Sequence, residues 1–210
     1  MKGSFLDAAE LQKRRTPIEL RDYVNELRDS ARKDDAVWHQ GMLRSGLFKQ
    51  LIQEIIPVKD YVLHRYRNED VLVSPVLGNQ GYDAEVFDST NRLIERIEVT
   101  APYDGEYEVI DTRLAIKRGY GKMRIYSPGE NVRKLKTLVL KAAEAKSKKD
   151  YSDSTLLIVL ELRPPSPESS TRTAYQTELD LIIKSLKLIT FCANKVVMQC
   201  PEGHMVAIHG

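Results

Sequence analysis

Two short apolar segments that carry carboxylates constrain this chain more than any other feature. Residues Tyr82–Phe87 and Leu93–Thr100 flank a polar turn, and this pattern predicts a β-hairpin. Acidic side chains stand inside both apolar runs, among them Asp83 and Glu98. A buried carboxylate is costly unless a partner compensates its charge, and a divalent cation is a common partner. The hairpin therefore predicts either a metal site or a set of acids with structural partners.

The first forty residues predict a helical extension. Thr16 can cap a helix that begins at Pro17, and Glu19 completes a capping box. Apolar residues then recur at helical spacing and form a narrow stripe: Leu20, Val24, Leu27 and Ala31. We therefore divide the chain into an N-terminal helical extension, residues 1–40, and an α/β domain, residues 41–210.

The α/β domain is predicted to alternate helices and strands. A helix begins near Ser45, carries Glu54, and is expected to end or kink at Pro57. Pro75 predicts that the first strand lies at a sheet edge or is bulged. The elements expected after this helix are strands at 71–77, 82–87 and 93–100, a helix at 104–118, a short strand at 121–126, a helix at 131–149, a buried strand at 155–160, a loop at 163–173, a helix at 175–186, an antiparallel strand pair at 188–192 and 195–200, and a strand at 205–208.

Composition limits the class of protein. Hydrophobic residues make up 42% and charged residues 30% of the chain, which is typical of a globular protein rather than a disordered one. No apolar run approaches the roughly 18 residues that span a membrane, and Met1–Arg15 lacks the apolar core of a signal peptide. Cys192 and Cys200 are expected to be free thiols. We therefore expect a cytoplasmic protein without a membrane partner.

The order of helix, three strands, helix and strand, with acids on the second and third strands, resembles the PD-(D/E)xK nuclease superfamily, which has the restriction-endonuclease-like fold. The resemblance covers roughly residues 41–162. It implies an α/β core with a central mixed sheet flanked by helices. It also implies one or two Mg²⁺ ions, or Mn²⁺, held by an aspartate on the second strand and by a Glu-x-Lys motif on the third.

Mapped onto this sequence, the resemblance implies that Asp83 and Glu98 are metal ligands and catalytic residues, with Glu54 as a supporting acid. The sequence departs from the motif at the lysine, because Thr100 stands where the family carries that cation. Threonine cannot supply a positive charge to a phosphate, so we place Thr100 at the edge of the site. Lys117 or Lys134, both on predicted helices after the third strand, are candidates to replace the lysine.

Each of these residues also has a structural interpretation. Asp83 can be an acid beside a turn, Glu98 can be paired within the fold, and Glu54 can lie on the polar face of its helix. Glu85 can share a face with Asp83 or point to solvent. The many lysines and arginines of residues 131–149 can follow a phosphate backbone, or they can be a solvated helix face.

The sequence thus predicts a metal-dependent nuclease that cleaves phosphodiesters, in DNA rather than RNA. An inactive protein with the nuclease fold, acting as a nucleic-acid-binding or protein-interaction module, is the alternative favoured by Thr100. A third alternative is an unrelated α/β protein whose acids are structural. The resemblance also allows a homodimer or a place within a larger complex.

Overall fold

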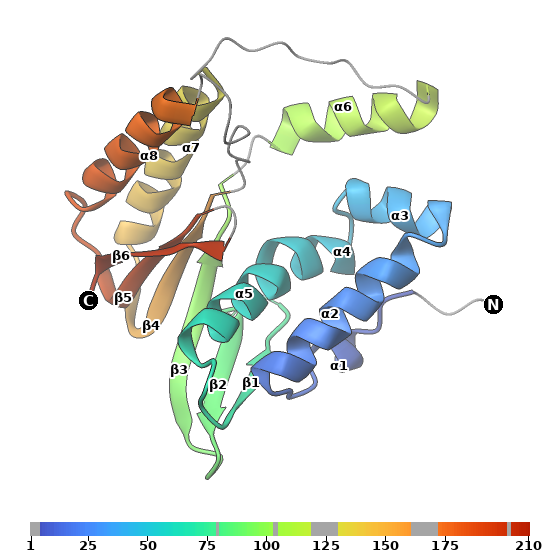
Figure 1. Cartoon of the computed structure of the whole chain (residues 1–210), viewed down its shortest axis with the longest axis horizontal. Coiled ribbons are helices and arrows are strands. Elements are labelled where there is room, and N and C mark those ends of the chain that lie inside the picture. The colour runs from blue at the N-terminus through green and yellow to red at the C-terminus, as the bar shows by residue number, and fades with distance from the viewer. Residues whose placement is uncertain (1–4, 79, 103–104, 119–129, 161–171, 201–202) are drawn as a thin grey trace.

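A computed structural model of the chain describes residues 5–78, 80–102, 105–118, 130–160, 172–200 and 203–210. These residues form an α/β structure with one six-stranded mixed sheet and helices on both of its faces (Figure 1). The sequence-based prediction of a mixed sheet flanked by helices is therefore confirmed.

The strands follow one another across the sheet in chain order. The first three strands pair antiparallel, the third to fifth pair parallel, and the sixth is antiparallel to the fifth. The edge position expected for the strand that contains Pro75 is confirmed. The strands are β1 (Val71–Pro75), β2 (Ala84–Asp88), β3 (Leu93–Thr100), β4 (Asp150–Val159), β5 (Cys192–Gln199) and β6 (Met205–His209).

The helices occupy the two faces of this sheet in separate groups, and each group packs over its own apolar cluster. The helices are α1 (Ala8–Leu11), α2 (Pro17–Ala31), α3 (Asp35–Met42), α4 (Leu47–Gln50), the π-helical turn η1 (Leu51–Ile55), α5 (Ile56–Arg65), α6 (Gly105–Arg118), α7 (Glu130–Ser147) and α8 (Arg172–Leu186).

Alternation along β3 directs its side chains to both groups of helices. Ile97 belongs to the cluster that contains Leu20 of α2 and Val58 of α5. The opposite face of the sheet packs against α7 and α8, which lie beside each other in Figure 1. Glu98 is paired in register with Leu156, a member of this second cluster, so Glu98 faces α7. The two faces of β3 therefore meet different helices.

The capping box predicted for α2 is confirmed. The Thr16 hydroxyl accepts the N–H of Glu19, and the Glu19 carboxylate accepts the N–H of Thr16. Leu20 and Val24 are buried in the same cluster as strand residues of the sheet. The N-terminal extension therefore contributes to the main hydrophobic core.

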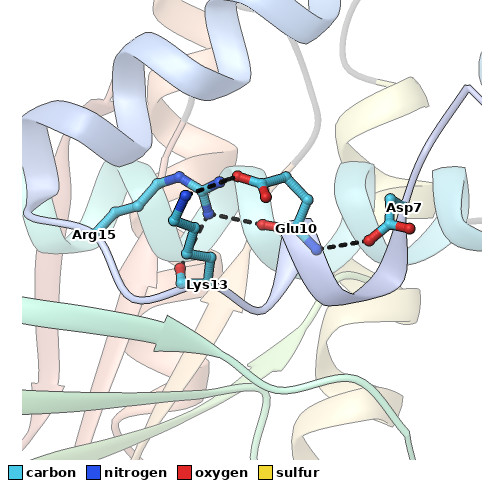
Figure 2. A network of polar contacts seen from close by, with 4 residues as sticks. All are labelled: Asp7, Glu10, Lys13 and Arg15. Carbon is cyan, nitrogen blue, oxygen red and sulfur yellow. Dashed lines mark hydrogen bonds and ion pairs between the residues drawn. The ribbon is translucent and has the colours of Figure 1, made fainter.

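The buried side chain of Arg15 fastens the segments of the extension to one another (Figure 2). Its guanidinium donates hydrogen bonds to the backbone oxygens of Glu10 (2.8 Å) and Lys13 (3.0 Å) and to the Glu10 carboxylate (2.5 Å). The same group lies 3.8 Å from the ring centroid of Tyr23. The backbone of Arg15 exchanges hydrogen bonds with Val73, so the extension also covers part of the edge strand β1.

Of the two outcomes expected at Pro57, an end of the helix that contains Glu54 or a kink in it, the first is wrong, because the helix continues. The segments α4, η1 and α5 follow without a break from Leu47 to Arg65. Within an α-helix the proline ring would clash with the carbonyl four residues earlier, that of Gln53. The π-helical turn, in which Ile56 N–H donates to Leu51 O, widens the helix just before the ring. The helix therefore continues past Pro57.

The prediction of an antiparallel strand pair at 188–192 and 195–200 is wrong. No turn forms at residues 193–194, because β5 runs through them and pairs in parallel with β4 over most of its length. This pairing supplies backbone partners along β5, and the apolar residues Val196–Met198 are buried between the two helix groups. The strand expected at 205–208 is confirmed as β6, and both cysteines are free thiols.

The remaining helices and strands agree with the expected elements. The central buried strand is β4, and α6, α7 and α8 are found at the predicted positions. The strand expected at residues 121–126 lies outside the described residues, as does most of the loop expected at 163–173. None of the described helices is both long and apolar enough to cross a membrane.

Substitution of Arg15 tests its role in fastening the extension. Arg15→Met keeps the apolar stem but leaves two carbonyls and a carboxylate without their donor. We expect the free energy of unfolding to fall by roughly 2 kcal/mol or more, measured by urea denaturation. Lys13→Met is the control, because Lys13 is exposed and its ion pair with Glu10 should contribute less than about 1 kcal/mol. Equal effects of the two substitutions would contradict this role.

Candidate active site

Two acids of the β2–β3 hairpin have partners near the surface. Glu85 is paired with Arg96, whose Nε lies 3.4 Å from its Oε1. Asp88 closes the turn, since its Oδ1 accepts the backbone N–H groups of Thr90 and Arg92, both at 2.9 Å. Hydrogen bonds from the Thr90 hydroxyl and the Arg92 N–H hold the pKa of Asp88 at about 2. These two acids therefore have structural roles.

A third acid, Glu95, is stabilised by hydroxyl groups. Tyr61 of α5 and Tyr66, which directly follows this helix, donate to its two carboxylate oxygens at 2.8 and 2.5 Å, and Thr155 of β4 donates to the first of these oxygens. Burial, followed by the charge of Glu95, raises the pKa of Tyr61, so this phenol remains a donor. The sequence analysis did not identify this cluster, which ties α5 to the strand that carries Glu98.

Glu98 lies on the other face of β3 and is paired with Lys146. The carboxylate is buried, and Lys146 Nζ donates to its Oε1. Lys146 comes from the last turn of α7, and its ammonium lies 5.5 Å from the ring centroid of Tyr151. Burial acts to lower the pKa of Lys146, but the hydrogen bond and charge of Glu98 outweigh it and the pKa is raised. Lys146 is therefore a permanent cation beside Glu98.

Asp83 lies close to Glu98 across the strand pair. It directly precedes β2, and its N–H donates to the backbone oxygen of Ile97 at 2.7 Å, so its backbone lies beside the residue before Glu98. The Asp83 Oδ2 accepts the N–H of Val99 at 2.7 Å. Burial raises the pKa of Asp83 to about 7, and the charges of Glu98 and Glu54 add to this rise against the opposing effect of the Val99 hydrogen bond.

Asp83 is thus the least compensated buried acid of this hairpin. In the part of the chain that the structure describes, Glu85 and Glu98 form ion pairs and Glu95 receives three hydroxyl donors, whereas Asp83 forms no ion pair and accepts the Val99 N–H. A half-buried Glu54 lies close enough for its charge to be felt by Asp83. Burial raises the pKa of Glu54 itself, with a smaller contribution in the same direction from Glu98. The charges of Asp83, Glu98 and Glu54 therefore act on one another, and the half-buried Lys146 is the cation in contact with Glu98.

The other candidate residues occupy different positions. Thr100 is buried at the end of β3, two residues beyond Glu98 on the same face. Lys117 is exposed near the end of α6. Lys134 is exposed on α7, twelve residues and therefore about 18 Å along the axis before Lys146. Of the lysines considered, the one that contacts Glu98 is Lys146.

The sequence contained a signal that singles out Lys146 among the many basic residues of α7. Lys146 follows Val139 by seven residues and Ala143 by three, so it continues the apolar stripe of the helix rather than its exposed side. A cation in such a stripe needs a buried anion. The sequence analysis grouped Lys146 with the solvated residues and did not use this spacing.

The donor set suits one Mg²⁺ or Mn²⁺ ion. Mg²⁺ is commonly held by one or two carboxylates together with water and phosphate oxygens, and Asp83 and Glu98 supply two carboxylates that lie close together. The raised pKa of Asp83 indicates a place where an added cation would be favourable. A ready-made group of three or more Asp, Glu, His or Cys ligands is not present among the described residues. Water and substrate would therefore complete the coordination.

Comparison of the chain with protein-family models, curated proteins and solved structures finds no match. The functional argument therefore depends on the geometry of Asp83, Glu98 and Lys146.

The raised pKa of Asp83 makes the stability of the fold depend on pH. Folded Asp83 keeps its proton up to a pH of about 7, whereas the unfolded chain loses it near 3.8, so the free energy of unfolding falls as pH rises between these values. Asp83→Asn removes this loss and keeps an acceptor for Val99 N–H. We expect it to stabilise the protein at pH 8 by on the order of 3 kcal/mol, and little at pH 4.

Thermal and urea denaturation at pH 4, 6 and 8 would measure the effect. Asp88→Asn serves as the control, since a pKa held at about 2 contributes stability above that range and its removal should not stabilise the fold. A gain in the free energy of unfolding of Asp83→Asn that does not change with pH would show that Asp83 is charged in the folded protein throughout this pH range.

Proposed function

We propose that this protein is a metal-dependent nuclease of the PD-(D/E)xK type that hydrolyses phosphodiesters in DNA. One observation carries the proposal: Asp83 accepts the N–H of Val99 beside Glu98, so the two acids lie close together, and the half-buried Lys146 contacts Glu98. Lys146 thus supplies the cation that the sequence lacks at Thr100, from a helix rather than from β3.

The order of the elements around the site supports this proposal. The helical segment with Glu54 precedes three antiparallel strands, and a parallel strand, β4, follows β3 after α6 and α7. This is the order on which the resemblance to the nuclease superfamily rests. Asp83 directly precedes β2, the second of the three strands, and Glu98 lies on β3, the third. The resemblance implies acids at about these two places.

The residues of the site would have different roles in hydrolysis. A bound Mg²⁺ ion would polarise the phosphodiester and lower the pKa of its water. Asp83 and Glu98 would hold the ion, and Glu54 would add negative charge nearby. Lys146 stays protonated and can stabilise the negative charge that develops on the phosphate oxygens. The Thr100 hydroxyl lies at the edge of the site as a neutral hydrogen-bonding group.

The exposed side of α7 supports nucleic acid as the substrate. Lys134 and Lys141 are exposed seven residues apart on α7, so they lie on one side of the helix about 10 Å apart, and the exposed Lys148 follows in the turn just after the helix. Arg133 and Lys149 add charge beside them. The whole chain carries a net charge of only +2, so this is a local concentration of positive charge suited to a phosphate backbone.

Nuclease assays with single substitutions test the proposed site. With Mg²⁺ or Mn²⁺ and plasmid and linear DNA, we expect hydrolysis by the wild type and a loss of roughly 100-fold or more in Asp83→Ala and in Lys146→Met. Asp88→Ala, an acid of the same hairpin outside the site, should retain activity. Equal activity in wild type and Asp83→Ala, or none in either, would refute the catalytic proposal. DNA binding without hydrolysis would favour the inactive binding module.

Salt-dependent binding tests the lysines on the exposed side of α7. The double substitution Lys141→Gln with Lys148→Gln should weaken binding of a duplex DNA and lower the slope of log affinity against log salt by about two. The matched control removes two exposed lysines elsewhere, Lys33→Gln with Lys187→Gln, and should change the slope little. Fluorescence anisotropy at several salt concentrations measures both. An equal loss in the two double variants would contradict a specific role for α7.

A further inference from the structure

We propose that Lys146 is a built-in competitor of the metal: its ammonium occupies Glu98 in the metal-free protein, and a divalent cation must displace it to bind. The inference rests on the part of the proposed function that assigns Asp83 and Glu98 to a divalent cation. It does not depend on hydrolysis. It adds a regulatory step, because occupation of the site becomes an exchange of one cation for another.

The contact between Lys146 and Glu98 is the first support. Glu98 is 8% exposed, and its Oε1 accepts a hydrogen bond from Lys146 Nζ. A metal bound to that carboxylate would bring a second positive charge next to the ammonium in a largely buried region, where charges repel strongly. The ammonium and the metal therefore exclude each other at this oxygen.

Glu98 is not the sole group that attracts the Lys146 ammonium among the described residues, and the side chain has a way to solvent. The ring of the buried Tyr151 has its centroid 5.5 Å from Nζ, and an aromatic face attracts a cation. The Lys146 side chain is 22% exposed, so its flexible stem also reaches solvent. The lysine can thus leave Glu98 without disturbing the packing of α7 on the sheet.

A nucleic acid would assist this exchange. A phosphate oxygen that enters the site attracts the ammonium away from Glu98 and frees the carboxylate for the metal. Because coupling between two ligands is reciprocal, metal binding would strengthen phosphate binding by the same factor. Lys146 would therefore link the two events, and the metal would bind weakly until a phosphodiester is present.

Calorimetric titration with Mn²⁺ alone tests the competition. Lys146→Met removes the competing charge and should bind Mn²⁺ at least roughly tenfold more tightly than the wild type. Lys146→Arg keeps the charge and should remain within about threefold of the wild type. Circular dichroism checks that the variants are folded. Unchanged or weaker Mn²⁺ binding by folded Lys146→Met would overturn the inference.

Chemical labelling of the wild-type protein tests the displacement directly and needs no variant. Acetylation of Lys146, followed by mass spectrometry, should rise several-fold when Mn²⁺ is bound, because the amine leaves its carboxylate. Lys141, which is exposed on the same helix, is the control and should not change. Unchanged labelling of Lys146 at saturating Mn²⁺ would also overturn the inference.

The outcomes of these experiments separate the competition at Glu98 from the proposed nuclease function. Displacement of Lys146 by Mn²⁺ in a protein that does not cleave DNA would leave the competition standing and refute only the nuclease. Cleavage without displacement would refute only the competition. Absence of Mn²⁺ binding in wild type and variants would refute both.

Discussion

The pairing of β3 with β2 on one side and β4 on the other is the constraint on which the rest of the structure depends. It directs Glu95 toward α5 and Glu98 toward α7, and it brings Asp83 close to Glu98. A shift of one residue in either register would exchange these faces and bury the wrong side chains. The apolar residues of β3 on the side of α5, such as Ile97, prevent such a shift because they are part of the core. The polar site is therefore positioned by hydrophobic packing.

The acids of the hairpin show how one fold can compensate buried charge in different ways. Glu95 receives three hydroxyl donors, and Glu98 receives an ammonium. Asp83 receives a backbone N–H from Val99, which is too little to keep its pKa at the ordinary value. Residues that serve a function are often not the residues that would make the fold most stable. The imbalance at Asp83 is of that kind, and it separates this residue from its structural neighbours.

Local patterns allowed much of the fold to be predicted. Alternation in residues 93–100 gave the strand, Thr16 with Glu19 gave the start of α2, and the apolar run beginning at Thr155 gave the central strand. The errors came from effects beyond a short window. Parallel pairing with β4 extended β5 through a predicted turn, and a π-helical turn let the helix pass Pro57. Lys146 was missed because its partner lies 48 residues away in the sequence.

The π-helical turn at residues 51–55 also has an implication for how the site could change. Such a turn holds one residue more than an α-helical turn, so it is equivalent to a single-residue insertion. Loss of one residue within it would close the bulge to an α-helical turn, which would change the direction in which the side chains of the turn point. Glu54 lies within this turn and near Asp83 and Glu98. The electrostatic environment of the acids thus depends on chain length as well as on residue type, and an insertion or deletion there could retune the site while every acidic residue stayed in place.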